Sequence, residues 1–169
     1  YCQWSHFNND DPIIYPNQPG KAHLHMFFGN TQTNANTTND SLINTGGGSC
    51  EGYAANRTAY WVPAMQTTNN EVILPASILI YYKTQGMANP EQFAEIPQGL
   101  KILSGDAKAT QAQNNLPNEF KCSVDGDVNG ALTIHSKVIP KCSKGVLRMV
   151  VVFPSCWDGK NLDSPDHRS

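Results

Sequence analysis

A chain of 169 residues is long enough to bury a hydrophobic core within one domain. Its formal net charge is −2 and its Lys and Arg residues form no cluster, which argues against a nucleic-acid partner. No apolar run approaches the roughly 20 residues of a membrane-crossing helix, so we expect no membrane insertion. Only 15% of the residues are charged, and the five cysteines include no Cys-x-x-Cys pair, which favours disulfides over a zinc site. We therefore expect a secreted protein whose signal peptide has been removed.

The predicted elements are mainly strands. The first strand that the pattern indicates is residues 22–28, and a long polar loop follows over 30–57. Further strands are predicted where β-branched and aromatic residues run between Pro, Gly or Asn, at 58–64, 72–83, 131–139 and 146–154. Short helices are predicted at 89–96 and 105–115. The chain is thus expected to be a single domain over 1–169, an antiparallel β-sandwich or jelly roll with long loops and one or two short helices.

The cysteines fit this picture. Cys122 and Cys142 bracket a segment with Asp-Gly and Asn-Gly turn signals, which makes them a plausible pair across a hairpin. Cys2 and Cys50 could join the start of the chain to the long loop, which leaves Cys156 over, although the sequence alone does not fix this connectivity. Three Asn-x-Ser/Thr sequons, which matter only where the host attaches N-glycans, begin at Asn36, Asn39 and Asn56.

Two histidines stand two residues apart in the otherwise apolar run 22–28. In an extended strand His23, His25 and Phe27 share one face, while the alternate residues form a core stripe on the other. The two imidazoles would lie about 7 Å apart along the strand. They could converge on one metal or one substrate, or one ring could act as a base while the other orients or polarises. The alternative is a hydrogen-bonded structural role.

Carboxylates stand near this strand in the sequence. Asp10 and Asp11 are adjacent, so repulsion between them could raise the pKa of one and make it an acid. The alternative is an Asp-Asp-Pro turn in which an Asp side chain caps backbone amides.

A second polar loop ends the chain, over 156–169. It contains Asp158 and Asp166, for which turn chemistry is again the alternative, and Asp166 with His167 could make a carboxylate-oriented imidazole. Trp157 in this loop could stack on a sugar. The groups that we expect to bind substrate are His6, Asn30, Asn56, Arg57, Tyr60, Lys83 and Trp157.

Several long motifs carry a resemblance to a known family. They are SHFNNDDPIIYPNQPGKAHLHMFFGNTQTNANTT, NRTAYWVPAM, IPQGLKILSGDA and FPSCWDGKNLDSPDHRS, and they resemble the secreted fungal and bacterial family catalogued as domain of unknown function nineteen-ninety-six. Its members are often joined to carbohydrate-binding modules such as the WSC domain, which implies a polysaccharide or cell-wall context. The family pattern continues past the Asp-His motif, so the resemblance implies that a C-terminal part, with the partner of Cys156, is missing after Ser169.

The resulting expectation is a secreted carbohydrate-active enzyme that hydrolyses a cell-wall glycan in a cleft lined by the histidine strand. One aspartate would protonate the leaving oxygen, and a second carboxylate or a His–Asp pair would activate water. The expected partner is a polysaccharide or oligosaccharide. The catalytic candidates are His23, His25, Asp10, Asp11, Asp158 and Asp166.

Three alternatives stay open. A polysaccharide lyase would use His25 or Tyr60 as base, with Arg57 or Lys83 neutralising the substrate carboxylate. A metal-dependent enzyme would hold a divalent metal at His23 and His25 with a third ligand from elsewhere, whereas the other readings need no cofactor. A non-catalytic carbohydrate-binding module would use aromatic side chains as sugar platforms.

Overall fold

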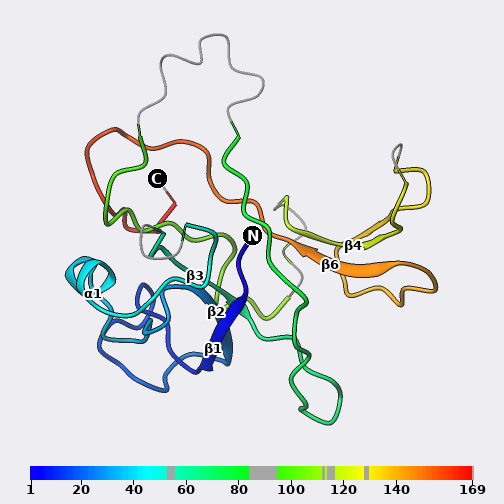
Figure 1. The fold of residues 1–169 in the computed structure, drawn as a ribbon, viewed down its shortest axis with the longest axis horizontal. Coiled ribbons are helices and arrows are strands. Elements are labelled where there is room, and N and C mark those ends of the chain that lie inside the picture. The colour runs from blue at the N-terminus through cyan, green and yellow to red at the C-terminus, as the bar shows by residue number, and fades with distance from the viewer. Residues whose placement is uncertain (53–55, 84–94, 112, 114–116, 128–129, 169) are drawn as a thin grey trace. The chain divides into compact units, whose positions relative to one another are not determined.

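The computed structural model describes residues 1–52, 56–83, 95–111, 113, 117–127 and 130–168. They group into two compact units, Tyr1–Gly99 (unit 1) and Leu100–Ser169 (unit 2). Each unit holds one three-stranded antiparallel sheet (Figure 1), so the prediction of a mainly β, antiparallel fold is confirmed. Within the described residues neither unit has a second sheet that would close a sandwich by itself. The single-domain prediction stays a prediction.

The sheet of unit 1 consists of β1 (Trp4–Asn8), β2 (His25–Gly29) and β3 (Ala59–Pro63), with β2 in the centre. All five residues of β2 are buried, since it has a neighbour along each edge and packed groups on both faces. On one face Met26 and Phe28 form the core with Cys2 and Cys50. Six partly buried residues pack against this core: Phe7, Tyr60, Val62, Ala64, Ile78 and Ile80.

The end of β2 depends on a glycine. Gly29 has a φ of +80°, and a Cβ placed on it would lie 1.8 Å from the carbonyl oxygen of Thr58. Only a residue without a side chain lets the two backbones approach this closely while also adopting a left-handed conformation. The next amide, that of Asn30, donates to the same Thr58 carbonyl at 3.2 Å, so the close approach continues the pairing between β2 and the chain before β3.

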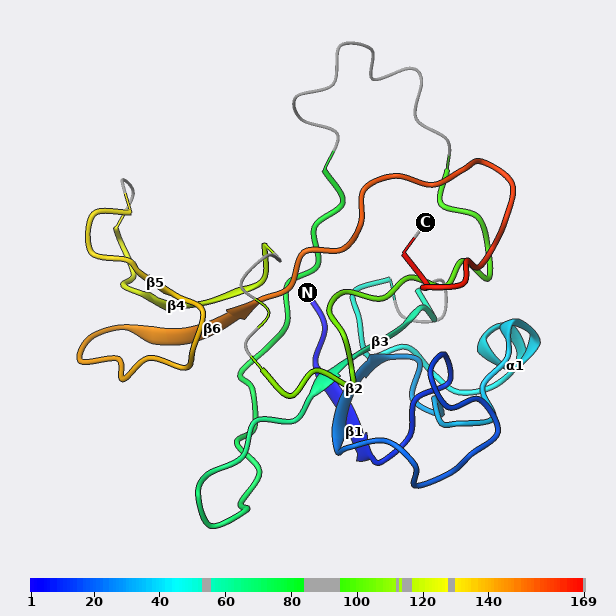
Figure 2. The same ribbon diagram turned by 180° about the vertical axis from the view of Figure 1, so that it is seen from behind.

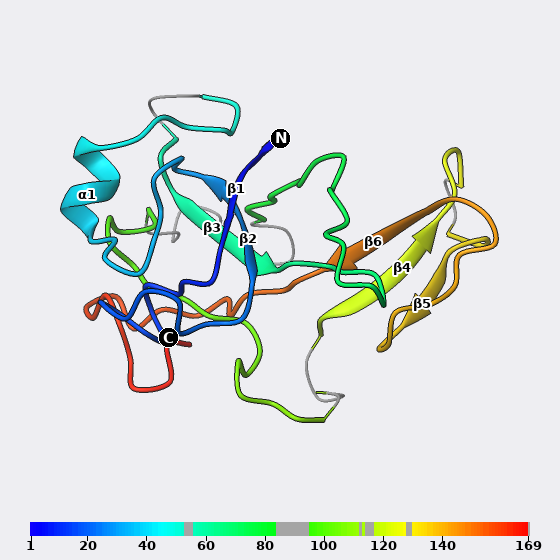
Figure 3. The same ribbon diagram turned by 90° about the horizontal axis from the view of Figure 1, so that it is seen from below.

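The helix content differs from the expectation. A short helix, α1 (Asn39–Asn44, Figure 3), forms in the connection between β2 and β3, where a loop was expected. Thr38 caps it in a capping box with Ser41. Residues 89–94 of one predicted helix lie outside the described residues, and 95–96 are not helical. The predicted helix at 105–115 is wrong for its described residues, which form turns and bends because the Asp106 side chain binds the Lys108 amide.

In unit 2, β4 (Glu119–Ser123) lies between β5 (Ile134–Ser136) and β6 (Val146–Val150), as Figure 2 shows from behind. The strand predicted at 131–139 has only three residues, those of β5, and the strand predicted at 146–154 ends at Val150.

The strand predicted at 72–83 is absent as a regular element among the described residues, where only isolated bridges occur at Val72 and Ile78. Pro75 has no backbone N–H for a ladder, and Leu74, Tyr81 and Tyr82 are largely exposed rather than packed on a sheet.

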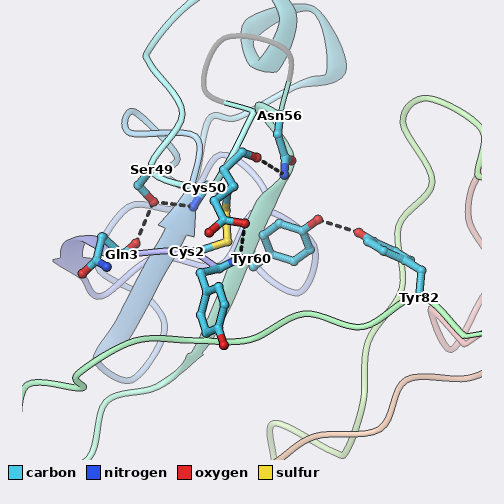
Figure 4. Close-up of a disulfide and its surroundings, with 10 residues drawn as sticks. Cys2, Gln3, Ser49, Cys50, Asn56, Tyr60 and Tyr82 are labelled. Atoms are coloured by element: carbon cyan, nitrogen blue, oxygen red, sulfur yellow. Dashed lines mark hydrogen bonds and ion pairs between the residues drawn. A yellow bond between two sulfur atoms is a disulfide. The ribbon is translucent and has the colours of Figure 1, made fainter.

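The cysteine pairing follows the expectation. Cys2 is bonded to Cys50 within unit 1 (Figure 4), and Cys122 to Cys142 within unit 2. Cys156 is free and exposed. These bonds are compatible with an oxidising compartment. None of the described helices is long and apolar enough to cross a membrane.

Candidate functional site

The face of the unit 1 sheet opposite the disulfide core carries a row of rings. Phe27 is fully buried on β2 and is paired in register with His6 on β1 and with Trp61 on β3. The His6 ring is parallel to Phe27 at 4.8 Å between centroids, and the Trp61 ring stacks at 6.0 Å. His25 meets the edge of Phe27 at 6.1 Å. Alternation along the strands thus separates an apolar face from a face of mixed aromatic and imidazole rings.

His25 is held in one tautomer. Its Nδ1 lies 2.8 Å from the backbone carbonyl oxygen of Asp10, and because a carbonyl only accepts, Nδ1 carries the proton. Nε2 then keeps its lone pair, and within the described part of the chain no hydrogen bond to it is found. The ring is 4% exposed.

The environment of His25 favours the neutral form. Burial lowers its pKa below the usual 6.5, and the positive charge of His23 lowers it further, against the Asp10 carbonyl and the negative charge of Asp11. A neutral, oriented imidazole with a free lone pair can accept a proton or bind a metal.

His23 is the second ring of the pair. It lies just before β2 and is exposed, with its centroid 4.3 Å from that of His25 and the planes tilted by 54°. The two rings are thus closer than the roughly 7 Å that the spacing along a strand alone would give. His23 is exposed to solvent, whereas His25 is buried, so the two rings suit opposite steps of proton transfer.

The turn after β1 fixes both His25 and Trp61. The Asp11 carboxylate accepts hydrogen bonds from the amides of Ile13 and Ile14 at 2.9 and 2.8 Å, so the turn interpretation is confirmed for this residue. Its other oxygen accepts from Nε1 of Trp61 at 3.2 Å. One Asp-Asp turn therefore positions an imidazole through the carbonyl of Asp10 and an indole through the side chain of Asp11.

The Asp10 carboxylate is buried and joins two loops. Its oxygens accept from the amide of Gly20 at 2.7 Å and from that of Ala35 at 3.0 Å. Burial by itself raises the pKa, but these two hydrogen bonds, with smaller contributions from Asn8 and the charge of His6, outweigh it and lower the pKa of Asp10. The side chain is therefore an ionised acceptor and lacks the raised pKa expected for a catalytic acid.

Two of the predicted substrate-binding residues, His6 and Asn30, make hydrogen bonds within unit 1. Nε2 of His6 donates to the carbonyl of Thr33 at 2.7 Å, and Nδ1 then accepts from the Ser5 hydroxyl at 2.8 Å. Asn30 is 1% exposed. Its Nδ2 donates to the backbone carbonyls of Leu42 and Thr45, in and just after α1. Its Oδ1 accepts from the backbone amide of Gln32.

Tyr60 and Lys83, two further predicted residues of unit 1, make contacts with other side chains. Tyr60 packs on the disulfide face, opposite His25, and its hydroxyl shares a 2.5 Å hydrogen bond with that of Tyr82 (Figure 4). Although much of the Tyr82 side chain is exposed, partial burial of its hydroxyl, and then this hydrogen bond, raise its pKa. Nζ of Lys83 lies 5.4 Å from the Tyr81 ring centroid.

Asn56 and Arg57 bind backbone carbonyls of unit 1. Nδ2 of Asn56 donates to Glu51 at 3.4 Å, and a guanidinium nitrogen of Arg57 donates to Ile43. Nε of Arg57 is buried and has no hydrogen-bond partner in the described part of the chain. These contacts hold the connection around α1.

In unit 2 the predicted residues make turns. Asp158 accepts from the amides of Lys160 and Asn161, and the Asn161 bond is the largest cause of its lowered pKa. Asp166 accepts from the Ser164 hydroxyl, the largest cause of its lowered pKa. Nε1 of Trp157 donates to the Asn161 carbonyl at 2.6 Å. That Asp158 and Asp166 act together with the histidine pair stays a prediction.

The structure adds a pair that the sequence did not indicate. Nδ1 of His167 donates to Asp163, at 2.6 Å, and not to its neighbour Asp166, so the expected Asp166–His167 pair is wrong. The Asp166 side chain turns instead to Ser164 and to the amide of Arg168. A spacing of four residues in an irregular loop has no period that would reveal the contact in advance.

The described residues do not supply a complete set of metal ligands. Among the described residues there is no group of three or more His, Cys, Asp or Glu side chains that could hold a metal ion. Within that part of the chain the metal interpretation thus has the two imidazoles of His23 and His25 and lacks a third ligand of these types.

Fold and site together define a mainly β protein with two disulfides and a converging imidazole pair on the central strand of one sheet. The model of the family described as Domain of unknown function (DUF1996) matches residues 11–169, so the chain belongs to this family, as the motifs indicated. No curated protein and no solved structure matches the chain.

Proposed function

We propose that this protein is a secreted carbohydrate-active enzyme that hydrolyses a glycan by proton transfer at His23 and His25. The observation that carries the proposal is the state of His25, a buried neutral imidazole whose Nδ1–H is fixed on the Asp10 carbonyl. Its Nε2 lone pair faces no hydrogen-bond donor among the described residues, as a general base requires. The two disulfides support export, and the polysaccharide context that the resemblance to this family implies supports a glycan substrate.

The proposed chemistry assigns opposite roles to the two rings. Nε2 of His25 removes a proton from a water molecule, whose oxygen forms a bond to the anomeric carbon of the sugar. The glycosidic C–O bond breaks, and His23, in its protonated form, gives a proton to the leaving oxygen. The two environments of the pair, one buried and one hydrated, suit this division of roles. Asp10 and Asp11 act as positioning residues, because their oxygens are bound to backbone amides and to Trp61.

The test is digestion of a panel of neutral and acidic polysaccharides by the full chain, with reducing ends and ultraviolet absorbance followed together. We expect new reducing ends without absorbance, and a rate lowered by roughly 10²-fold or more in His25→Gln, the usual range for loss of a general base. His135→Gln is the matched control, since His135 is an exposed imidazole on β5 that contacts Glu119. Cleavage at the wild-type rate by His25→Gln would remove His25 from the mechanism.

A polysaccharide lyase is the second candidate, because the same neutral, oriented imidazole of His25 suits its base. Asp10 has a lowered pKa and both its oxygens are occupied, so it does not serve as the acid of a two-carboxylate hydrolase. A neutral imidazole suits removal of the proton next to the carboxylate of a uronic acid. Activity limited to acidic glycans, with absorbance rising alongside the reducing ends, would select this reaction over hydrolysis.

A further inference from the structure

The sequon at Asn36 occupies the tip of a tight turn in unit 1. The amide of Thr37 donates to the carbonyl of Asn34 at 3.0 Å, which closes a four-residue turn. The Asn34 side chain accepts from the Asn36 amide at 2.8 Å and holds the tip in shape. Asn36 is exposed, and within the described part of the chain its side-chain amide makes no hydrogen bond.

The residue before the tip is fixed on the inner side. Ala35 is 1% exposed, its amide donates to the Asp10 carboxylate at 3.0 Å, and its carbonyl accepts from the Asn17 amide at 2.8 Å. With residue 35 anchored in this way, the exposed side chain of Asn36 is presented at the surface of the turn. The turn is therefore a preformed, outward-facing position for an Asn side chain.

The two other sequons are engaged in other contacts. Asn39 is also exposed, but it is the first residue of α1, and its sequon hydroxyl, that of Ser41, donates to the Thr38 carbonyl at 2.9 Å. Asn56 is half-buried, and its Nδ2 already donates to the Glu51 carbonyl. An N-linked glycan needs a free Nδ2 and a sequon hydroxyl that is available to the transferase, which favours Asn36 over both.

We propose that Asn36 is the N-glycan acceptor of this chain when it passes through a eukaryotic secretory pathway. In the modification, Nδ2 of Asn36 forms a bond to C1 of the first N-acetylglucosamine of a polyprenyl-diphosphate-linked oligosaccharide. The C1–O bond to the diphosphate breaks, Nδ2 loses one proton, and the polyprenyl diphosphate leaves. The sequon hydroxyl is that of Thr38. Independently of the proposed enzymatic function, the two disulfides are of the kind formed in the same compartment.

The glycan would stand beside the loop that holds Asp10. Ala35, whose amide binds the Asp10 carboxylate, is the chain neighbour of Asn36. Asp10 in turn orients His25 through its carbonyl, so the glycan would be connected to the imidazole site through Ala35 and Asp10.

The experiment is secretion of the full chain from a eukaryotic host, with intact mass measured before and after peptide-N-glycosidase. We expect one glycan on the wild type, on Asn39→Gln and on Asn56→Gln, and none on Asn36→Gln. Enzymatic release should convert Asn36 to Asp in the tryptic peptide. Thr38→Ser keeps both the hydroxyl and the helix cap and should keep the glycan, whereas Thr38→Ala should lose it.

A wild-type chain without a glycan, a glycan retained on Asn36→Gln, or a second glycan at Asn39 or Asn56 would each overturn the proposal. Thermal unfolding of the enzymatically deglycosylated variants is the control for folding. Gln at the turn tip is expected to fold normally, since the backbone there has no positive φ and the Asn36 side chain makes no bond in the described structure.

Discussion

At the scale of single residues, the adjacent aspartates show what a sequence reveals of a site and what it hides. Alternation along a strand indicated that His23 and His25 share a face about 7 Å apart, whereas in the structure His23 lies just before β2 and the ring centroids are 4.3 Å apart. The role of Asp10 was not predictable, since it orients His25 with a backbone carbonyl that every residue type carries. Its carboxylate, which looked like a candidate acid, is instead an ionised acceptor for two amides from distant loops.

The lowered pKa of His25 predicts a particular loss of stability in acid. The unfolded chain, in which this ring titrates near 6.5, binds more protons than the folded chain as the pH falls below that value. The contribution of His25 to stability is therefore present above about pH 6.5 and is lost on acidification through its lower folded pKa. We expect the free energy of unfolding in urea, measured from pH 8 to pH 5, to fall less steeply in His25→Gln than in the wild type. Equal slopes in His25→Gln and the wild type would contradict the prediction.

At the scale of elements, some strands predicted from sequence patterns are present in the structure, and others are absent because the segment lacks a strand to pair with. The strand at 58–64 is present as β3, and Tyr60 and Trp61 face opposite sides as alternation requires. The apolar run 72–83 forms no regular strand among the described residues, since a run of β-formers needs a partner with free backbone groups as well as propensity. The helix α1 was missed because it has only six residues, four of them polar, and its capping box uses Ser41 in place of the usual Glu or Gln.

The end of β2 gives a sharp test of the sheet in unit 1. Gly29→Ala places a methyl group 1.8 Å from the Thr58 carbonyl oxygen in addition to the strain of a positive φ. The matched control is Gly20→Ala, which has a φ of +73° and nothing within 4 Å of the new methyl group, so it carries the strain alone, about 1–2 kcal/mol. We expect Gly29→Ala to lose several kcal/mol, and at least 2 kcal/mol more than the control, in chemical unfolding. Similar losses in the two variants would mean that β2 and the chain before β3 separate without cost.

At the scale of the whole molecule, each unit carries its own covalent cross-link and its own sheet. Cys2–Cys50 spans 48 residues and lies in the core of unit 1, whereas Cys122–Cys142 spans 20 residues and joins β4 to the segment after β5. No disulfide of the described residues joins unit 1 to unit 2. The family match begins at residue 11 and continues through both units.

The two disulfides are expected to differ in their contribution to stability. Loss of either should cost about 2–5 kcal/mol, and the longer loop adds roughly 1 kcal/mol for Cys2–Cys50. Replacing Cys2 and Cys50 by Ala also opens space beside Met26 and Phe28 in the core. Hydrogen exchange of the β2 amides in this double variant, and of the β4 amides in Cys122→Ala/Cys142→Ala, reports on each sheet separately. We expect the larger loss of protection at β2, and a larger loss at β4 would reverse the ranking.

The order of the parts along the chain has a consequence for biosynthesis. The two histidines, the Asp10–Asp11 turn and the Trp61 indole all come from the first 61 residues, and both cysteines of the cross-link that supports their sheet precede β3. Chains emerge from the ribosome N-terminus first and fold in units as they appear. The ring face can therefore assemble on the nascent chain, and its cross-link can close, before all of unit 2 has emerged from the ribosome.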